Sequence, residues 1–449
     1  MPAEARHVIV ADLGFGDAGK GTIVDWLAGR SAATGRPVRA VLRFNGGAQA
    51  AHTVVRADRR SHTFAQFGAG TFAGVPTLLT RHALVEPLAL AREAAALSAL
   101  GVPDPLDLIS VDRGALITTP LHAVVNRARE AARGGGAHGS CGIGVGETVA
   151  YALDEPDLAL RAGDTESPSR LRRRLLALHE WAATTVRELG DPTSGPLPGV
   201  DELIRAYLSF ARRIRLTGDG EIARLAAGGR LVFEGAQGVL LDEWRGFHPH
   251  TTWSTTTFAN ALDLLAEAGV DRGDVCRLGV TRTYATRHGA GPFPSEDPSL
   301  APLLPEPHNG TGRWQGAFRV GHLDLVLLRY AAEVCGGLDA LAVTHLDTAA
   351  GAARERLRVA TAWRAGGTRI TRLRPGAFAD LDHQRRLTAL AHAARPEMVL
   401  PDRPWDELLA DALGVPVAVT SWGPRSGDKQ PATVDEITTR EDQDRVPVS

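Results

Sequence analysis

Four glycines and one lysine stand close together near the start of the chain, in the segment G-F-G-D-A-G-K-G-T at residues 14–22. Glycines let backbone N–H groups converge on an anion, Lys20 adds a positive charge, and a following helix adds the positive end of its dipole. The segment therefore predicts a cradle for phosphate. It approaches the Walker pattern G-x-x-x-x-G-K-[ST], but Gly21 separates Lys20 from Thr22, so an ordinary P-loop is not strictly matched. A glycine turn of purely structural use is the alternative.

Short apolar runs recur along the chain and predict the framework that holds this loop. Residues 8–12 form the first run, and residues 23–28 after the glycines have helical character, which together indicate strand, loop and helix. Further β-rich runs lie at residues 38–44, 231–233, 278–284, 341–344 and 415–420. The segments between these runs are long enough for crossover helices, so the sequence predicts an α/β fold with a mainly parallel sheet.

Composition narrows the class of protein. The chain has 449 residues, 44% hydrophobic and 23% charged, with a formal net charge of -2, so it lacks the global basic field that favours nucleic acid or anionic membrane. Its three cysteines are widely separated and have no metal-ligand spacing, which indicates neither a disulfide framework nor a zinc site. The first apolar run is too short for a signal sequence or a membrane span. A globular protein of the reducing cytoplasm fits these features.

The phosphate loop is followed by a second motif, and the pair resembles the adenylosuccinate synthetase family. That family carries W-G-D-E-G-K-G-K where residues 15–22 stand, and its R-[FY]-x-G-G-x-N-A-G-H-T motif is similar to R-F-N-G-G-A-Q-A-A-H-T at residues 43–53. Further similar segments follow in order along the chain: F-E-G-A-Q-G-V-L-L-D at 233–242, T-R-H-G-A-G-P-F-P at 286–294, T-H-L-D at 344–347 and S-W-G-P at 421–424. The resemblance implies one large α/β domain over residues 1–449, assembled as a homodimer.

The resemblance also implies a reaction. A carbon–nitrogen bond forms at an oxygen-bearing purine carbon once phosphoryl transfer from GTP has made that oxygen a leaving group, and L-aspartate then supplies the nitrogen. Asp17 matches the family's catalytic base and is also the implied Mg²⁺ ligand, together with the backbone carbonyl of Ala51. His52 matches the histidine that stabilises negative charge on the oxygen. A structural histidine is the bland alternative for His52.

Three sets of binding residues are implied. Asp347 is the candidate acceptor of hydrogen bonds from guanine, beside His345, where the family has lysine. The implied GTP-binding residues are Gly16, Gly19, Lys20, Gly21, Thr22, Thr53, Arg319, His345, Asp347, Ser421, Gly423 and Pro424. The implied acceptor-binding residues are Asp17, Lys20, Gln49, Ser140, Gln237, Thr252 and Arg313, with residues 134–148 as an acceptor loop. The implied aspartate-binding residues are Thr311, Gly312, Arg313 and Arg319, in a loop at residues 308–324.

Several departures from the family pattern concern the acceptor. The family's T-T-G-R-G-I-G-P loop, which binds a monophosphate, appears as H-G-S-C-G-I-G-V at residues 138–145, without the threonine pair and the arginine. Gln49 and Ala51 replace asparagine and glycine. IMP or an IMP-like purine is the first expectation, and a deoxynucleotide, a nucleoside or a purine analogue is the alternative. A non-catalytic GTP-binding paralogue or a signalling GTPase would be a different class, which retention of Asp17 and His52 disfavours. The tail at residues 426–449 is expected to fray.

Overall fold

The computed structural model describes residues 6–30, 37–134, 139–190, 196–306, 309–310 and 314–431. Its main element is a ten-stranded sheet in which every neighbouring pair is parallel except the pair at one edge. In order across the sheet, the strands are β19 (Lys429–Pro431), β18 (Val417–Ser421), β14 (Ala340–Thr344), β11 (Val275–Arg282), β1 (His7–Asp12), β10 (Arg230–Glu234), β2 (Val38–Arg43), β5 (Thr77–Leu79), β7 (Ile109–Asp112) and β9 (Arg215–Thr217). Each strand run predicted from the sequence overlaps a strand of this sheet, although the run at residues 278–284 extends to Tyr284, which begins a strand of a second sheet. The predicted single α/β domain is confirmed.

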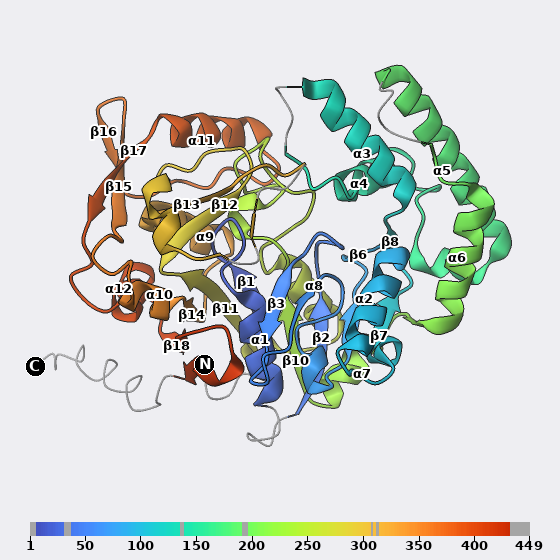
Figure 1. The fold of residues 1–449 in the computed structure, drawn as a ribbon, viewed down its shortest axis with the longest axis horizontal. Coiled ribbons are helices and arrows are strands. Elements are labelled where there is room, and N and C mark those ends of the chain that lie inside the picture. Colours follow the sequence, from blue (N-terminus) through green and yellow to red (C-terminus); the bar gives the residue numbers. More distant parts are fainter. Residues whose placement is uncertain are drawn as a thin grey trace, which may run out of the picture.

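Helices cover both faces of the sheet, so its central strands are apolar on both sides (Figure 1). In β1, Val8 and Val10 pack into one buried cluster, whereas Ile9 and Ala11 pack into another. The helices packed around the sheets are α1 (Lys20–Gly29), α2 (Pro87–Ala99), α7 (Glu221–Ala227), α8 (Ala259–Glu267), α9 (Leu325–Val334), α10 (Leu346–Ala350), α11 (Leu381–Ala393) and α12 (Trp405–Leu413). Because successive side chains of a strand are buried on opposite faces of the sheet, the strand is a continuous apolar run in the sequence.

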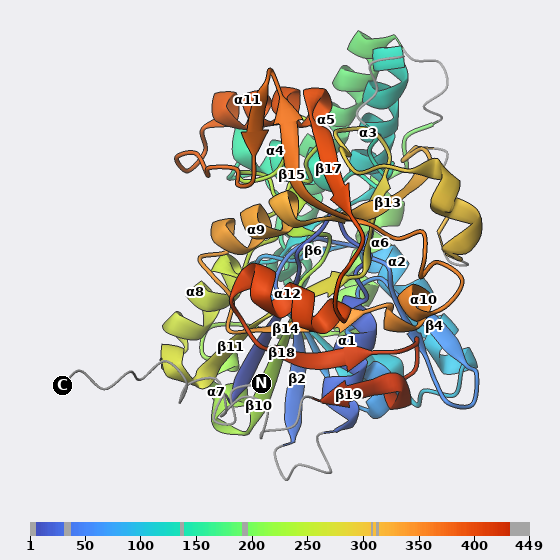
Figure 2. The same ribbon diagram turned by 90° about the vertical axis from the view of Figure 1, so that its left-hand side faces the viewer.

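Two further regions flank the main sheet on opposite sides (Figures 1 and 2). One is a five-stranded sheet of β12 (Tyr284–His288), β13 (Phe318–Asp324), β15 (Val359–Ala365), β16 (Thr368–Ile370) and β17 (Arg395–Val399). The other is a helical lobe of α3 (Pro120–Arg133), α4 (Val145–Asp154), α5 (Pro168–Leu189) and α6 (Val200–Arg213), with its own buried cluster. Two two-stranded pieces complete the described strands: the hairpin of β3 (His52–Val55) with β4 (Ser61–Phe64), and the parallel pair of β6 (Leu84–Val85) with β8 (Leu116–Ile117).

Some predicted loop boundaries are wrong. Residues 318–324, placed in the aspartate loop, form β13, because they pair with β12 on one side and β15 on the other. Residues 145–148, placed in the acceptor loop, are the first turn of α4. Residues 426–431, placed in the predicted frayed tail, are folded, because β19 pairs with β18 and the Lys429 side chain is buried. Residues 432–449 lie outside the described part of the chain.

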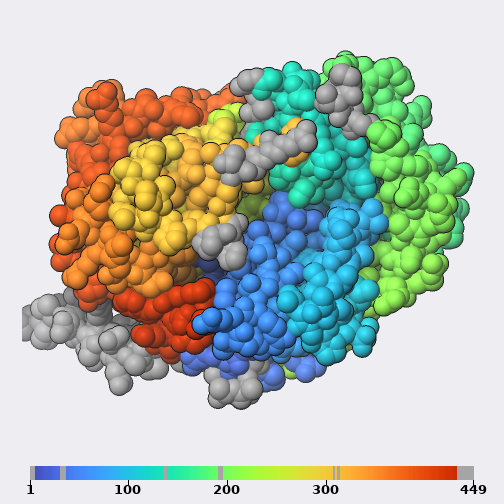
Figure 3. Space-filling model, in the orientation of Figure 1, coloured from blue at the N-terminus to red at the C-terminus, as the bar shows by residue number. Residues whose placement is uncertain are grey.

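The carboxyl ends of the parallel strands meet at one edge, where ligands bind in open α/β sheets. Figure 3 shows the surface hollowed there, between the teal helices of the lobe and the yellow segments near β13, with blue N-terminal residues below. In the described ranges, no helix has the length and apolar character needed to cross a membrane.

Candidate active site at the carboxyl edge of the sheet

Asp12, the last residue of β1, organises the phosphate loop. Its two carboxylate oxygens accept hydrogen bonds from the backbone N–H groups of Gly14 and Ala18, each at 2.8 Å. One of these oxygens also lies 3.1 Å from Nζ of Lys20. The loop can wind this tightly because Gly16 and Gly19 adopt left-handed backbone angles, with φ of 103° and 89°. Asp12 was not among the predicted site residues, although an acidic residue ending a buried strand is a readable signal.

Lys20 joins this loop to the loop after β10. Its ammonium donates to the backbone carbonyl of Gln237 at 2.7 Å as well as to Asp12, and the side chain is only 4% exposed. Gln237 is held with a positive φ of 56°. A buried ammonium with carboxylate and carbonyl partners is fixed in direction. The predicted phosphate cradle is therefore a preformed structure that connects two strands of the sheet.

Gly21, the residue that breaks the Walker pattern, stands against His52. A Cβ atom built on Gly21 would lie 2.8 Å from Cβ of His52 and 3.1 Å from its carbonyl carbon. No side chain fits in that space. The extra glycine therefore lets β3 approach the first turn of α1, which places His52 beside Lys20 and the phosphate loop.

The imidazole of His52 is held from behind by Glu234. Nδ1 of His52 lies 2.6 Å from Oε1 of Glu234, and Oε2 of Glu234 accepts the backbone N–H of Ala69 at 3.0 Å. Burial lowers the pKa of His52 more than the Glu234 charge raises it. Burial raises the pKa of Glu234, but the attractions of His52 and Arg43 outweigh that effect and lower it. The pair therefore consists at rest of a neutral ring that donates Nδ1–H to a carboxylate. That carboxylate favours uptake of a proton from solvent at Nε2, and the charged ring can then donate Nε2–H to an oxygen that becomes negative.

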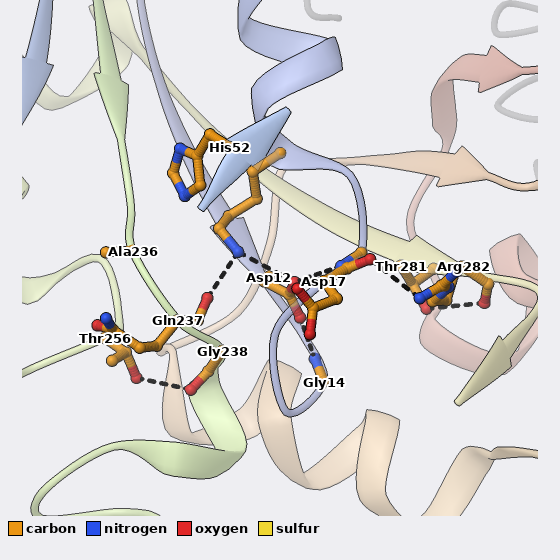
Figure 4. Close-up of polar contacts among 12 residues, drawn as sticks. Asp12, Gly14, Asp17, His52, Ala236, Gln237, Gly238, Thr256, Thr281 and Arg282 are labelled. Carbon is orange, nitrogen blue, oxygen red and sulfur yellow. Dashed lines mark hydrogen bonds and ion pairs between the residues drawn. The ribbon is translucent and has the colours of Figure 1, made fainter. Parts of the chain in front are cut away.

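Asp17 is held by contacts from the strands β11 and β12. Its Oδ2 lies 3.4 Å from Nε2 of His288, and its backbone carbonyl accepts a hydrogen bond from Arg282 at 3.1 Å. Burial alone would raise the pKa of Asp17, but the hydrogen bond and charge of His288, with Lys20 and Arg282, lower it overall. The carboxylate is thus ionised at neutral pH, as a base or a metal ligand must be. Asp12, Asp17, His52 and Gln237 gather around the loop that follows β1 (Figure 4).

Among the described residues of this site, Asp17 is the side chain that fits the implied Mg²⁺ ion. Within the described ranges, no cluster of three or more His, Cys, Asp or Glu side chains could hold a metal. Mg²⁺ in nucleotide enzymes is typically bound by one or two carboxylates together with substrate phosphates, so Asp17 alone suffices on the protein side. Ala51, the other implied ligand through its carbonyl, is exposed and directly precedes His52.

Two side-chain amides mark the space where an acceptor base is expected. Oε1 of Gln49 and Oε1 of Gln237 are buried and have no hydrogen-bond partner. Both lie against the same glycine pair, because Cβ atoms built on Gly46 and Gly47 would meet Gln237 and Gln49 at 3.0 and 3.1 Å. A buried amide oxygen without a protein partner is satisfied by a donor from a water or a ligand. Thr252 lies half-buried, with its backbone N–H bonded to Leu241.

The residues predicted to bind the guanine of GTP lie at the carboxyl ends of β14 and β18. The Thr22 hydroxyl donates to the carbonyl of Pro424 at 2.8 Å, which links the phosphate helix to the S-W-G-P loop. Ser421 donates to the carbonyl of Gly423, and Lys429, missed by the sequence analysis, donates to the same carbonyl at 2.8 Å. Asp347 is exposed at the first turn of α10, as a base-binding carboxylate should be.

His345 and Thr53, both predicted to bind GTP, each have a hydrogen-bond partner within the protein. Burial lowers the pKa of His345 well below its usual value, so this ring is neutral where the family has a lysine. Its Nδ1 lies 2.9 Å from the Thr344 hydroxyl. Thr53 on β3 shares a hydroxyl hydrogen bond of 2.9 Å with Thr63 on β4, so it also holds the hairpin that carries His52.

The side chain of Arg319 is bound to other groups of the protein. Its guanidinium pairs with Glu296 and donates to the carbonyls of Gly289 and Gly291 at 3.1 and 2.9 Å. These contacts occupy most of its N–H donors, and they fix the loop after β12. Contact with GTP or aspartate therefore stays a prediction for Arg319. Thr311, Gly312 and Arg313 lie outside the described residues.

A phosphate cradle at the carboxyl edge of a parallel sheet, with a carboxylate and a carboxylate-backed histidine beside it, defines a nucleotide-dependent α/β enzyme. Comparison with known proteins gives the family. The family model described as adenylosuccinate synthetase matches residues 9–426. The chain belongs to the adenylosuccinate synthetase family and is a ligase of the class that forms carbon–nitrogen bonds.

Individual relatives agree with this assignment. The chain is 30% identical to an adenylosuccinate synthetase of Myxococcus xanthus, over 94% of this chain and 97% of the relative. It is 32% identical to adenylosuccinate synthetase 1 of Chromobacterium violaceum, over 94% and 96%. The fold is similar to that of the adenylosuccinate synthetase of Plasmodium falciparum, with a TM-score of 0.79 at 18% identity, covering 95% of this chain and 99% of the other. It is also similar to a succinoaminodeoxyadenylate synthetase of cyanophage S-2L, with a TM-score of 0.56 at 15% identity, covering 97% and 99%.

Proposed function

We propose that this protein uses GTP to phosphorylate the 6-oxygen of an IMP-like purine and then joins L-aspartate to the same carbon. Asp17 removes the ring proton while the γ-phosphoryl group moves to the oxygen, and His52, backed by Glu234, stabilises the negative charge of that oxygen. The aspartate amino group then attacks the carbon, and phosphate leaves. The products are the succinylamino purine, GDP and phosphate. The observation that carries the proposal is the convergence of Asp17, Lys20 and His52 at one edge of the sheet.

The remaining components of the reaction follow from the same site. Mg²⁺ is the proposed metal, with Asp17 and the carbonyl of Ala51 as its protein ligands, and when bound it would neutralise phosphate charge. Asp347, with the loop from Ser421 to Pro424, is the proposed guanine site. GTP, aspartate and the purine are the proposed partners, in a cytoplasmic homodimer.

A non-catalytic GTP-binding paralogue is the competing function. The hydrogen bond between His52 and Glu234 favours catalysis, because a histidine oriented by a buried carboxylate is a typical arrangement of active sites. A simple GTPase is disfavoured by Gly21, whose close contact serves His52 and not the phosphates.

The test is GDP release with mass spectrometric detection of product, using Mg²⁺, GTP and aspartate with IMP, dGMP, GMP or inosine. Aspartate-dependent formation of a succinylamino product is expected with at least one acceptor. Asp17→Ala should abolish turnover and leave the far-ultraviolet circular dichroism spectrum unchanged. GTP binding without any aspartate-dependent GDP release would favour the non-catalytic paralogue, and full turnover by Asp17→Ala would remove the role given to this residue.

A further inference from the structure

The acceptor loop already has an anion bound to its backbone, and that anion belongs to the protein. Oε2 of Glu130, on α3, accepts hydrogen bonds from the backbone N–H groups of Gly139 at 2.9 Å and Ser140 at 3.3 Å. Glu130 is 4% exposed. Gly139 has a φ of 74°, a left-handed turn that directs successive N–H groups to one side. A concave set of N–H groups of this kind is what would bind a phosphate, and here a carboxylate fills it.

Among the described residues, the arginines of α3 near this loop are paired as well. Arg133 binds the same Glu130 at 2.5 Å, in the next turn of α3. Arg129 lies 3.2 Å from the Glu147 carboxylate, and Arg127 donates to the carbonyl of Gly142 at 2.9 Å. Each arginine of α3 thus has a protein partner. A phosphate dianion at residues 139–142 would have to displace Glu130 from these N–H donors, and it would lie beside a buried carboxylate whose charge only Arg133 offsets.

Hydroxyl and aromatic groups form the rest of this surface. The Ser140 hydroxyl donates to Oδ1 of Asn126 at 3.0 Å, so its lone pairs can accept a hydrogen bond from a ligand hydroxyl. A Cβ atom built on Gly142 would lie 2.7 Å from Cδ1 of Trp314, and one built on Gly146 would lie 2.9 Å from Cδ1 of Trp253. Both indole rings therefore pack on the loop backbone. Trp253 is 47% exposed, and an aromatic face suits an uncharged sugar better than a phosphate dianion.

We infer that the acceptor carries a free hydroxyl, and no phosphate, at the end that contacts residues 139–142. The acceptor class is thus an unphosphorylated purine nucleoside or a close analogue. This inference rests on the ligase function proposed above and specifies its substrate. The purine end of the acceptor would meet Gln49 and Gln237, and the hydroxyl end would meet Ser140, behind which Glu130 is buried.

The test compares inosine and IMP as acceptors in the full-length protein, with Mg²⁺, GTP and aspartate held saturating. A kcat/KM for inosine at least about 10-fold above that for IMP is expected, because a facing carboxylate penalises the phosphate. A kcat/KM for IMP equal to or above that for inosine would overturn the inference and leave the ligase function standing. Absence of aspartate-dependent GDP release with every purine tested would overturn both.

The variant Glu130→Gln tests whether the Glu130 charge causes the preference for inosine over IMP. Glu130→Gln keeps an oxygen that accepts from Gly139 and removes the negative charge, so the inosine preference should narrow by about 10-fold. Glu166→Gln, which alters an exposed ion pair with Arg113 in the helical lobe, is the matched control and should leave the ratio unchanged. An unchanged ratio in folded Glu130→Gln would overturn the role of this carboxylate. If Glu130→Gln fails to fold, the ratio measured for the unmodified protein still decides the inference.

Discussion

Nδ1 of His52 and Oε1 of Glu234 lie 2.6 Å apart, although 182 positions separate the two residues in the chain. The strands β2 and β10 are neighbours in the sheet, so the segment after β2 and the end of β10 meet at the same edge. The carboxylate fixes which ring nitrogen carries the proton, and Nε2 is left for chemistry. His52 therefore acts as one half of a pair.

Glu234→Gln should lower kcat by about 10- to 100-fold, because a neutral amide no longer stabilises a positively charged His52 ring. The substitution keeps an oxygen for the N–H of Ala69, so the fold should persist. Steady-state kinetics measure the change, and KM for GTP should move less than kcat. The double variant with His52→Ala should be no slower than His52→Ala alone, since the two residues act as a unit. Additive losses would show that Glu234 acts independently of His52.

His288→Gln should shift the acid limb of the kcat/KM profile to higher pH. The hydrogen bond and charge of His288 help to lower the pKa of Asp17. Without them that pKa rises, so Asp17 becomes protonated, and inactive as a base, at a higher pH than before. A pH–rate profile measures the shift, and His383→Gln, distant on α11, is the control. An acid limb that stays in place would mean that Lys20 and Arg282 alone keep Asp17 ionised.

Much of the fold could be predicted from the sequence, because the signals for its strands and its phosphate loop lie in contiguous segments. A parallel strand buried on both faces is a continuous apolar run, so strands such as β1 and β14 are visible without any partner. The phosphate loop is visible because its glycines and Lys20 are contiguous. By contrast, β13 was assigned to a loop, since its pairing with β12 and β15 depends on segments far along the chain.

The same limit applies to the site. Glu234 and His288 lie inside recognised motifs, but their roles exist only through contacts with His52 and Asp17. Arg319 shows what residue type alone leaves out, because its ion pair with Glu296 depends on a contact that only the fold reveals, while its contact with GTP or aspartate stays a prediction. Glu130 had no signal in sequence at all, since an acidic residue on an amphipathic helix normally faces solvent.

Gly21→Ala should damage catalysis more than stability. The added methyl group would lie 2.8 Å from Cβ of His52, so β3 must move away from α1. A displacement of about 1 Å in a catalytic group costs roughly 100-fold in rate, whereas overpacking of this kind costs about 1 to 3 kcal/mol of stability. Steady-state kinetics and thermal unfolding separate the two effects. Gly427→Ala, where nothing lies within 4 Å of the new atom, is the control. Normal turnover by Gly21→Ala would show that the helix and β3 tolerate separation.

His122 gives the helical lobe a pH-dependent stability. Burial lowers its pKa from 6.5 to about 3, and Nδ1 accepts the backbone N–H of Thr119 at 3.0 Å in the N-terminal cap of α3. Because the unfolded chain takes up this proton below pH 6.5 and the folded chain does not, stability falls as pH decreases from 6.5 towards 3. At pH 5 the contribution is about 2 kcal/mol.

His122→Gln should remove this contribution, because glutamine does not titrate and is itself a common capping-box residue at this helix position. Urea unfolding at pH 7 and pH 5 gives the loss of unfolding free energy on acidification. That loss should be smaller by about 2 kcal/mol in His122→Gln than in the unmodified protein. His392→Gln changes an exposed histidine on α11 and should leave the loss as it was. Equal losses of unfolding free energy in all three proteins would mean that His122 takes up its proton in the folded lobe as readily as in the unfolded chain.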